Sequence, residues 1–458
     1  MENFKELISK EFSFDPNHNQ LKILERLMSE VMLRENLSLN QLTNCLNHDM
    51  AQKKYLGRDK FFALKKLLIN RRFPLTKANN ALKESDIFFS KLKQPLDNNW
   101  QVKKTFIPEA VFVEKEVRKS FVVDNFKKAF PSAKTTVINS YGQHLKENKF
   151  TLAELKKPIV FIIKEKWDFL KPCPCTKSHL RCGYWILNLG FGCPYDCSYC
   201  FLQQYSNFPG LILPGNLDDF FDKFDSFAKK LKQPIRLGTG EFCDSLALDN
   251  ITGYSKKLIP YFSKKNVLFE LKTKSTSIES ILKIPAPPNI IISWSLNPSK
   301  IAETEELGAA TLGERLAAAR KVQDSGYLCG FHFDPIIHTS GWETLYKETV
   351  KMLYESLEPP FAWISLGTLR GSRNLKTISE MRFPKGKIFY GELLLGEDKK
   401  LRYPEFLRKE VYAKMLRWIR KYDQKTPLYL CMESKSVWET IDKNLDSTSK
   451  IEKYLINR

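Results

Sequence analysis

Apolar residues recur every three to four positions along residues 1 to about 105, as in the segments 21–28 and 61–68. This period matches one face of an amphipathic helix, so we expect a helical extension here. The polar stretch 94–100 interrupts the pattern and marks the predicted end of this first domain.

Between residues 106 and 183, short apolar runs alternate with helical patterns and predict a small α/β lead-in. From residue 184 to 435, apolar strands are separated by helix-length segments. Six strands are predicted, at 185–189, 235–237, 267–271, 290–293, 328–333 and 362–366. Repeated strand-then-helix units favour an α/β fold with a parallel, partial (β/α)6 barrel related to the TIM barrel, followed by a tail at 436–458. Such barrels gather their chemistry at the carboxyl ends of the strands.

The chain has 458 residues, of which 43% are hydrophobic, enough for two or three domains with sizeable cores. Its 73 Lys and Arg against 52 Asp and Glu give a net charge of +21, which suits a polyanionic partner or simply a soluble basic protein. The charged start lacks the apolar core of a signal peptide, and no stretch approaches about 18 uninterrupted apolar residues. We therefore expect a cytoplasmic protein without membrane contact.

Six of the ten cysteines lie between Cys173 and Cys200. A large soluble chain needs no disulfide staples, so metal ligation explains the crowding better. Cys193, Cys197 and Cys200 have the spacing C-x3-C-x2-C and could bind three irons of a [4Fe–4S] cluster, which leaves the fourth iron open. A zinc site or buried structural thiols are the alternatives, but the next cysteine, Cys243, is 43 residues further on.

This pattern, with the aromatic Tyr199 before its last cysteine, resembles the radical S-adenosylmethionine (SAM) superfamily. Further segments narrow the resemblance to the spore photoproduct lyase family over roughly residues 110–435. They are CPYDCSYCFLQ at 193–203, GEFCDS at 240–245, GERLAAARKV at 313–322 and GWE at 341–343. The resemblance implies a partial barrel of the radical SAM type, a [4Fe–4S] cluster on the three cysteines and SAM on the open iron.

The resemblance also implies roles for single residues. The residues expected around SAM are Gly238, Thr239, Gly240 and Glu241 at its amino group, Lys274 and Ser295 at its carboxylate, and Tyr199 near its adenine. Cys243 would donate a hydrogen atom to the product radical, because a thiol S–H bond is weak. The alternatives are a solvated charge for Lys274, a packed aromatic ring for Tyr199 and a small buried hydrophobe for Cys243.

The implied reaction is the direct reversal of a UV-induced thymine dimer, 5-thyminyl-5,6-dihydrothymine. In this reaction a 5′-deoxyadenosyl radical takes the C6 hydrogen, the methylene bridge between the bases breaks, and Cys243 quenches the thymine radical. In the family, tyrosines on both sides of the last cluster cysteine help to relay the hydrogen atom back, so that SAM is regenerated. The resemblance implies this catalytic role for Tyr199, whereas the second position here is Phe201, which has no hydroxyl. The electron that starts the reaction would come from a carrier such as a flavodoxin or ferredoxin.

A bulky lesion in a duplex must be rotated out of the stack to reach a barrel mouth, so basic side chains are needed at the flanking phosphates. Arg382, Lys385 and Lys387, before a predicted hairpin near Gly396, are the expected nucleic-acid contacts, with an ordinary solvated face as the alternative. Residues 53–77 carry nine Lys and Arg against Asp59 alone. The helical extension could therefore be an accessory DNA-binding module.

Two further groups lie outside the family pattern. A C-x-C-x3-H-x2-C group could bind a second metal, with zinc the simplest choice, or could be loop thiols; it consists of Cys173, Cys175, His179 and Cys182. His332 and Asp334 alternate along the fifth predicted strand and face the same way. They would line the substrate pocket or form a hydrogen-bonded core pair.

Three functions follow from these observations. The leading one is a radical SAM lyase of the spore photoproduct type that acts on UV-damaged DNA. The second is a radical SAM enzyme on the same scaffold with another nucleic acid or a small molecule as substrate. The third is a metal-stabilised nucleic-acid-binding protein without catalysis. A brown protein that cleaves SAM under reducing conditions would favour the first two over the third.

Overall fold

The computed structural model describes residues 2–52, 54–78, 86–88, 105–166, 169–176, 178–206 and 208–457. Lys53 and the predicted boundary stretch 94–100 lie outside these residues. The chain divides into two compact units. The first consists of Met1–Pro95 and Arg370–Pro404, and the second of Leu96–Leu369 and Glu405–Arg458.

The first unit contains the predicted helices. They are α1 (Glu2–Phe12), α2 (His18–Glu35), α3 (Leu39–Ala51), α4 (Arg58–Arg72) and α5 (Pro74–Ala78). A capping box starts α2, because the Asn17 side chain accepts from the Gln20 backbone N–H at 3.0 Å and the Gln20 side chain accepts in return at 2.9 Å. The apolar face that the sequence predicts is buried, with Leu24 of α2 and Leu64 of α4 both fully inaccessible.

Residues 370–404 pack with these helices, although the sequence pattern assigned them to the barrel domain. They form β14 (Arg370–Ser372), α15 (Arg373–Arg382), β15 (Leu394–Leu395) and β16 (Lys400–Arg402). The hairpin predicted near Gly396 is confirmed as the antiparallel pair β15–β16. Arg72 Nη2 donates to the Phe389 carbonyl at 2.9 Å, and the Thr76 N–H donates to Glu392 Oε1 at 2.7 Å. These contacts join two parts of the chain that are about 300 residues apart.

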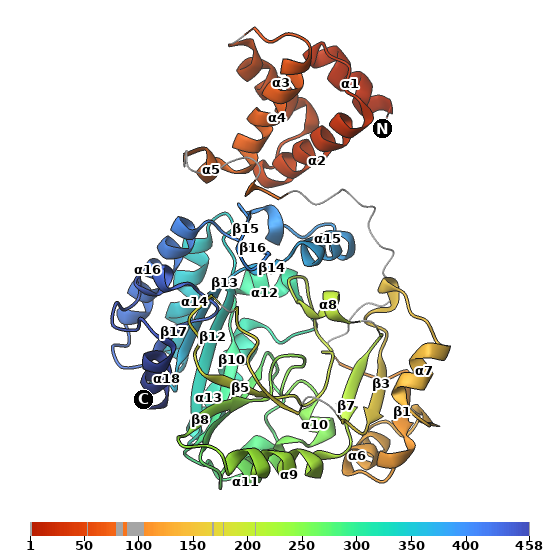
Figure 1. The fold of residues 1–458 in the computed structure, drawn as a ribbon, viewed down its shortest axis with the longest axis vertical. Helices are drawn as coiled ribbons and strands as arrows, with labels where there is room; N and C mark the ends of the chain where they lie inside the picture. Colours follow the sequence, from red (N-terminus) through yellow and green to blue (C-terminus); the bar gives the residue numbers. More distant parts are fainter. Residues whose placement is uncertain are drawn as a thin grey trace. The chain divides into compact units, whose positions relative to one another are not determined.

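The second unit is built on an eight-stranded sheet with the order β17-β13-β12-β10-β9-β8-β5-β4. Its strands are β4 (Leu170–Pro172), β5 (Tyr184–Leu187), β8 (Ile235–Gly238), β9 (Val267–Thr273), β10 (Ile290–Ser295), β12 (Leu328–Ile336), β13 (Ile364–Thr368) and β17 (Leu428–Leu430). All neighbours are parallel except β4 and β5. The six predicted strands are confirmed, and Figure 1 shows the curved, open sheet they form.

Helices follow the strands, as the repeated pattern predicts. They are α9 (Leu217–Ala228), α10 (Asp249–Thr252), α11 (Ser255–Phe262), α12 (Ser299–Glu305), α13 (Leu312–Asp324), α14 (Trp342–Ser356), α16 (Glu405–Arg420), α17 (Lys435–Trp438) and α18 (Thr448–Ile456). The strands are buried on both faces, which explains their continuous apolar sequence. Every residue of β10 is buried, for example. The tail is also packed, since Ile451 and Leu455 of α18 are fully buried.

The predicted lead-in is a second, parallel sheet with the order β2-β1-β3-β7. It contains β1 (Ala110–Glu114), β2 (Lys134–Ile138), β3 (Ile159–Ile163) and β7 (Leu211–Pro214), with α6 (Phe121–Ala129) and α7 (Tyr141–Glu147). Strand β7 comes after the three-cysteine segment, beyond the predicted end of the lead-in. The chain therefore leaves one sheet at β5 and enters the other at β7, and the cysteines lie between them.

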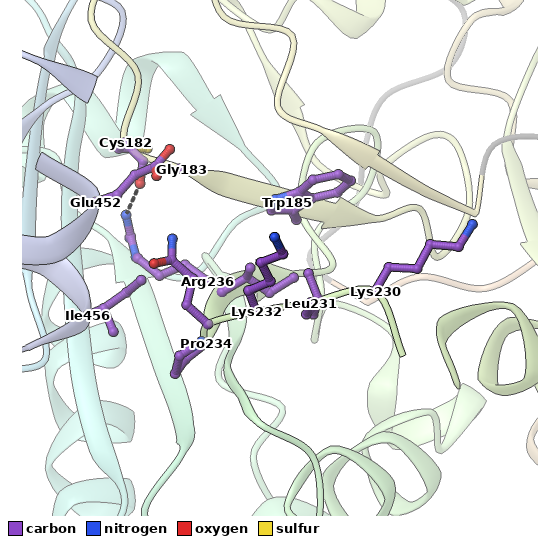
Figure 2. A pocket seen from close by; sticks show the side chains of 12 residues that line it. Cys182, Gly183, Trp185, Lys230, Leu231, Lys232, Pro234, Arg236, Glu452 and Ile456 are labelled. Carbon is purple, nitrogen blue, oxygen red and sulfur yellow. Dashed lines mark hydrogen bonds between the residues drawn. The ribbon is translucent and has the colours of Figure 1, made fainter. Parts of the chain in front are cut away.

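A cavity of about 190 Å³ lies at the amino ends of β5 and β8, away from the cysteine segment. Figure 2 shows Lys232 beside Trp185 on one side and Ile456 on another. Arg236 also lines it and donates to the Cys182 carbonyl at 3.4 Å. In barrels of this type the amino ends of the strands are associated with stability, so we do not assign the chemistry to this cavity.

The buried ion network of the first unit yields a stability prediction. Glu30 and Arg72 are 3% and 1% exposed at their side chains, and Arg72 Nε donates to Glu30 Oε2 at 2.7 Å. Glu30→Ala leaves this guanidinium buried without its carboxylate, so we expect a loss of about 3–5 kcal/mol in the free energy of unfolding of the first unit. Urea denaturation of the full chain measures it.

Lys5→Ala is the matched control, because it removes an exposed ion pair, with Asp15 at 3.1 Å. Exposed pairs contribute at most about 1 kcal/mol. Equal losses for Glu30→Ala and Lys5→Ala would contradict the importance of the buried network.

Candidate cluster and cofactor site

The three cysteines of the predicted cluster site lie on one loop between β5 and β7. Cys197 is buried in the short strand β6 (Asp196–Cys197), and Cys200 immediately precedes the turn into α8 (Leu202–Tyr205). Gln203 fixes the curvature of this loop from within, because its Nε2 donates to the carbonyls of Cys197 at 2.9 Å and Ser198 at 3.0 Å. Backbone groups of the same loop also hydrogen-bond to two of the thiols, Tyr195 to Cys193 and Leu202 to Cys200, and lower the pKa of both against the larger effect of burial.

A second segment clamps the loop from outside. Strand β6 pairs antiparallel with β11 (Glu306–Leu307), so that Cys197 lies opposite Glu306. The Ser198 N–H donates to the Glu305 carbonyl at 2.8 Å, and the Ser198 hydroxyl donates to the Glu305 carboxylate. Two residues of the cluster loop are therefore paired through their backbone with the segment that follows α12.

Lys156, from the lead-in, reaches the same loop. Its Nζ donates to the carbonyls of Cys193 at 2.9 Å and Tyr195 at 2.5 Å. Burial raises the pKa of Cys193 to about 12, and the ammonium of Lys156 opposes this rise. It acts in the same direction on Cys200. A cation held behind the loop favours the thiolate forms that a metal cluster needs. The sequence pattern gave no reason to single out this lysine.

The donor set fits a multi-iron group better than a single ion. The thiols lie within electrostatic reach of one another, since Cys193 and Cys200 each raise the pKa of Cys197. Among the described residues, however, no three Cys, His, Asp or Glu side chains are arranged to hold one metal ion. Three cysteine thiolates on one loop suit a cubane, in which each binds a different iron. The predicted use of Cys193, Cys197 and Cys200 for a [4Fe–4S] cluster is compatible with this geometry.

The strand end predicted to meet the amino group of SAM lies next to this loop. Gly238 ends β8, and a Cβ there would lie 1.7 Å from the Tyr184 hydroxyl, so only glycine fits. Thr239 is buried, and its hydroxyl donates to Ser245 Oγ at 2.6 Å. Gly240 follows, and Glu241 pairs with Lys171 Nζ at 3.2 Å. Thr239 and Glu241 fix the turn, and Gly240 between them is buried and has no side chain to block the approach of a ligand.

Lys274, at the end of β9, extends toward the cluster loop. Its Nζ lies 5.8 Å from the centre of the Tyr199 ring. Burial alone would lower the pKa of Lys274, but Glu306 and Cys197 raise it above its ordinary value, so the ammonium stays charged. Ser295, at the end of β10, is 7% exposed. The structure thus brings both residues predicted for the SAM carboxylate to the carboxyl ends of neighbouring strands.

Glu306 connects these parts and was not predicted from the sequence. Its carboxylate pairs with Arg315, both side chains being fully buried, and it accepts from the Tyr199 hydroxyl and from Asn297 Nδ2 at 2.8 Å. Burial alone would raise the pKa of Glu306, but Arg315 and Lys274 lower it to about 2. The Gly313–Val322 motif contains Arg315 and was the signal that could have led to its partner.

Cys243 lies three residues after Gly240, and its Sγ is 3.6 Å from the Thr239 carbonyl oxygen. Burial raises the pKa of Cys243, and nearby Cys193 adds to the rise. The thiol therefore keeps its hydrogen at neutral pH. It lines a small cavity of about 30 Å³ together with Gly192 and Pro194 of the cluster loop. A neutral S–H group thus lies beside the predicted cluster.

The predicted second metal site has no support among the residues that the structure describes. The sulfurs of Cys173 and Cys175 are 3.6 Å apart, but no three Cys, His, Asp or Glu side chains of the described residues are arranged to hold an ion. Cys431, at the end of β17, raises the pKa of Cys173 and joins this thiol group from a distant part of the sequence. We therefore do not propose a zinc ion here, nor His179 and Cys182 as its ligands.

His332 is part of a buried polar layer inside the barrel. Its Nε2 lies 2.8 Å from Glu270 Oε1, and Trp363 Nε1 donates to the same oxygen at 2.9 Å. Burial lowers the pKa of His332 despite the neighbouring carboxylate. This arrangement corresponds to the alternative of a hydrogen-bonded core group rather than a residue of the substrate pocket.

The predicted phosphate contacts lie on the first unit. Lys385 and Lys387 are exposed. Arg382 is 5% exposed, and its guanidinium lies 5.0 Å from the centre of the Phe383 ring. Its burial argues against a direct role at phosphate, so we retain only the two lysines.

The match to known proteins covers most of the second unit and residues 370–404 of the first. A family model for spore photoproduct lyase matches residues 106–425. The spore photoproduct lyase of Clostridium acetobutylicum is 25% identical over 278 residues, which cover 57% of this chain and 81% of that protein. The enzyme of a Geobacillus species is 28% identical over 214 residues, covering 44% and 62%.

Solved structures confirm the fold. A spore photoproduct lyase complexed with dinucleoside spore photoproduct has a TM-score of 0.63 and 23% identity, covering 71% of this chain and 99% of that chain. A variant with bound AdoMet, which is SAM, and dinucleoside spore photoproduct gives 0.63 and 24% over the same shares. The predicted partial barrel of the radical SAM type is confirmed by this likeness. The chain belongs to the spore photoproduct lyase family of the radical SAM superfamily.

Proposed function

We propose that this protein is a radical SAM lyase that reverses spore photoproduct in DNA. The observation that supports this proposal most strongly is the Cys243 thiol beside the three-cysteine loop, in a chain whose residues 106–425 match the spore photoproduct lyase model. The curated relatives bear the name of this enzyme, and a solved relative holds dinucleoside spore photoproduct.

The residues divide the work in the following way. Cys193, Cys197 and Cys200 would bind three irons of a [4Fe–4S] cluster, and Lys274 and Ser295 would bind the carboxylate of SAM. When bound, this cluster and SAM supply a 5′-deoxyadenosyl radical able to remove a hydrogen atom from the lesion. The backbone at Gly240 permits close approach of the SAM amino group.

Cys243 would complete the repair. Its S–H bond breaks homolytically, and the hydrogen atom forms a C–H bond on the thymine radical left after the bridge between the bases has broken. The burial that raises the pKa of Cys243 supports this role, because a thiolate would have no hydrogen atom to give. Hydrogen-atom donation therefore needs the neutral thiol that this environment favours.

DNA and an electron carrier are the proposed partners. Lys385 and Lys387 are exposed and would contact phosphates beside a flipped-out thymine lesion. A flavodoxin or ferredoxin would supply the electron, and we infer a cytoplasmic enzyme because DNA and such carriers occur there. No helix among the described residues has both the length and the apolar character to cross a bilayer.

A second candidate is a radical SAM enzyme of the same scaffold with another nucleic-acid substrate. It is favoured by Phe201, which lies directly after Cys200 and has no hydroxyl. Its ring is 37% exposed and packs edge-on against Tyr205, with the ring centres 5.7 Å apart. A changed aromatic surface beside the cluster loop could suit a different lesion.

Anaerobic incubation with an oligonucleotide containing spore photoproduct separates these candidates. We expect restored thymines, and in Cys243→Ala we expect SAM cleavage to persist while clean repair falls by at least about tenfold, a change of about 1.4 kcal/mol. Cys45→Ala, which removes a thiol of the first unit, is the control and keeps full repair. Chromatography of nucleosides and of 5′-deoxyadenosine measures both reactions.

SAM cleavage by the unaltered protein without restored thymines would favour the second candidate. Unchanged repair by Cys243→Ala would exclude this thiol as the hydrogen donor. A protein that binds DNA but neither contains the cluster nor cleaves SAM would point to the non-catalytic alternative.

Lys156→Met tests the support of the cluster loop. The change removes two hydrogen bonds and a positive charge near Cys193 and Cys200. Because that charge favours the more negative, reduced cluster, we expect a shift of its midpoint potential to more negative values. Electron paramagnetic resonance during a redox titration measures the shift.

Lys156→Arg keeps the charge and should retain most of the original potential. Lys157→Met is the neighbouring control, since the Lys157 ammonium pairs with Glu109 at 3.9 Å. Equal potentials in Lys156→Met and the unaltered protein would rule out this electrostatic role.

A further inference from the structure

The first unit concentrates the positive charge of the chain. Its two segments contain 26 Lys and Arg against 15 Asp and Glu, whereas the whole chain contains 73 against 52. This unit thus carries about half of the net charge in less than a third of the residues. Helices α1 to α5 also precede residue 106, where the family match begins. Residues 1–95 contribute 17 Lys and Arg against 11 Asp and Glu, and the other segment, 370–404, lies within the family match.

Helix α4 has a buried face and an exposed face of unusual composition. Phe61 and Leu64 point into the helical core, with 6% and 0% exposed. Phe62 is 59% exposed, and Leu56, just before the helix, is 80% exposed. These two large exposed apolar residues, within seven positions of the sequence, are called the patch here. The Phe62 ring makes an edge-on contact with Phe61, with the ring centres 5.4 Å apart, but most of its side chain remains exposed.

Exposed lysines flank the patch. Lys66 is exposed one turn after Phe62, and residues four apart lie on the same face of a helix. Lys54 is exposed two residues before Leu56. Asp59 is the acidic residue of the segment 54–66, which contains five Lys and Arg in total. This surface therefore combines two exposed apolar side chains, Leu56 and Phe62, with a net positive charge.

We propose that the exposed surface formed by Lys54, Leu56, Phe62 and Lys66 binds DNA outside the lesion. Lysines attract phosphates without regard to sequence, and an aromatic or aliphatic side chain can stack on a base or insert between base steps. Charge complementarity favours DNA over an acidic surface of another protein, because the proposed function already brings a long polyanion to this chain. The proposal rests on that function only for the identity of the nucleic acid.

Fluorescence anisotropy with the full-length protein and lesion-free DNA tests the surface. The probes are a 20-base-pair duplex and one of its single strands, which distinguish insertion between base pairs from stacking on open bases. Phe62→Ala should weaken binding to at least one probe by about fivefold or more, and Phe62→Tyr should restore it. Lys66→Ala should lower the slope of log affinity against log salt by roughly 0.9 on the duplex or 0.7 on the single strand.

Controls separate this effect from general charge and from folding. Leu33→Ala shortens a 41% exposed side chain of α2, and Lys443→Ala removes an exposed lysine of the second unit. Both should bind DNA like the unaltered protein. Thermal unfolding checks that Phe62→Ala retains its structure, and Phe62→Tyr provides a second folded variant.

Repair of dinucleoside spore photoproduct is the independent readout, because such a short substrate has no flanking DNA to contact the surface. The Phe62 and Lys66 variants should repair it at the unaltered rate. Failure of every variant, including the unaltered protein, would reject the proposed function while the binding result still stands. Unchanged affinity and unchanged salt dependence in both Phe62→Ala and Lys66→Ala would overturn the DNA-binding surface.

Discussion

The buried ion pair between Glu306 and Arg315 is the constraint on which the candidate site depends. Two fully buried charges are expensive to remove from water, and the cost is offset only when their remaining hydrogen-bonding groups find partners. Here Arg315 Nη1 donates to the Ser295 carbonyl at 2.9 Å, and Asn297 and Tyr199 donate to Glu306. The pair therefore fixes the end of β10 and the cluster loop relative to one another.

This arrangement explains why several ordinary residues matter to the chemistry. Tyr346 donates from its hydroxyl to Asn297 Oδ1 at 2.7 Å and so extends the network to α14. On the opposite side, Lys156 holds two loop carbonyls from the lead-in. The cysteines take part in this support through their backbone, since the carbonyls of Cys193 and Cys197 accept from Lys156 and Gln203. Their positions result from polar contacts made by neighbours that have no metal-binding chemistry.

Sequence patterns were sufficient for the barrel because its strands are apolar throughout and its helices follow at regular distances. They missed β17, whose three residues are too short to show a period, and they could not indicate that β7 joins the lead-in sheet. The motifs placed Lys274 at the end of β9 and Cys243 in the loop after β8, where the structure has both, and their roles stay predictions. Lys156 and Glu306 were missed because their importance comes from partners distant in the sequence, and Arg382 was overvalued because its burial is a tertiary property.

Strand β7 has a consequence for the smallest piece of the chain that could assemble the site. A fragment that began at β5 would retain every cluster cysteine, yet it would lack β3, with which β7 forms its parallel register from Val160–Leu211 to Ile163–Pro214. The segment after the cysteines would keep the bridge between Ile212 and Phe191 but lose the strand that pairs with every residue of β7. The minimal catalytic fragment must therefore include the smaller sheet. This sheet supports the loop with the three cysteines and also precedes the barrel in the chain.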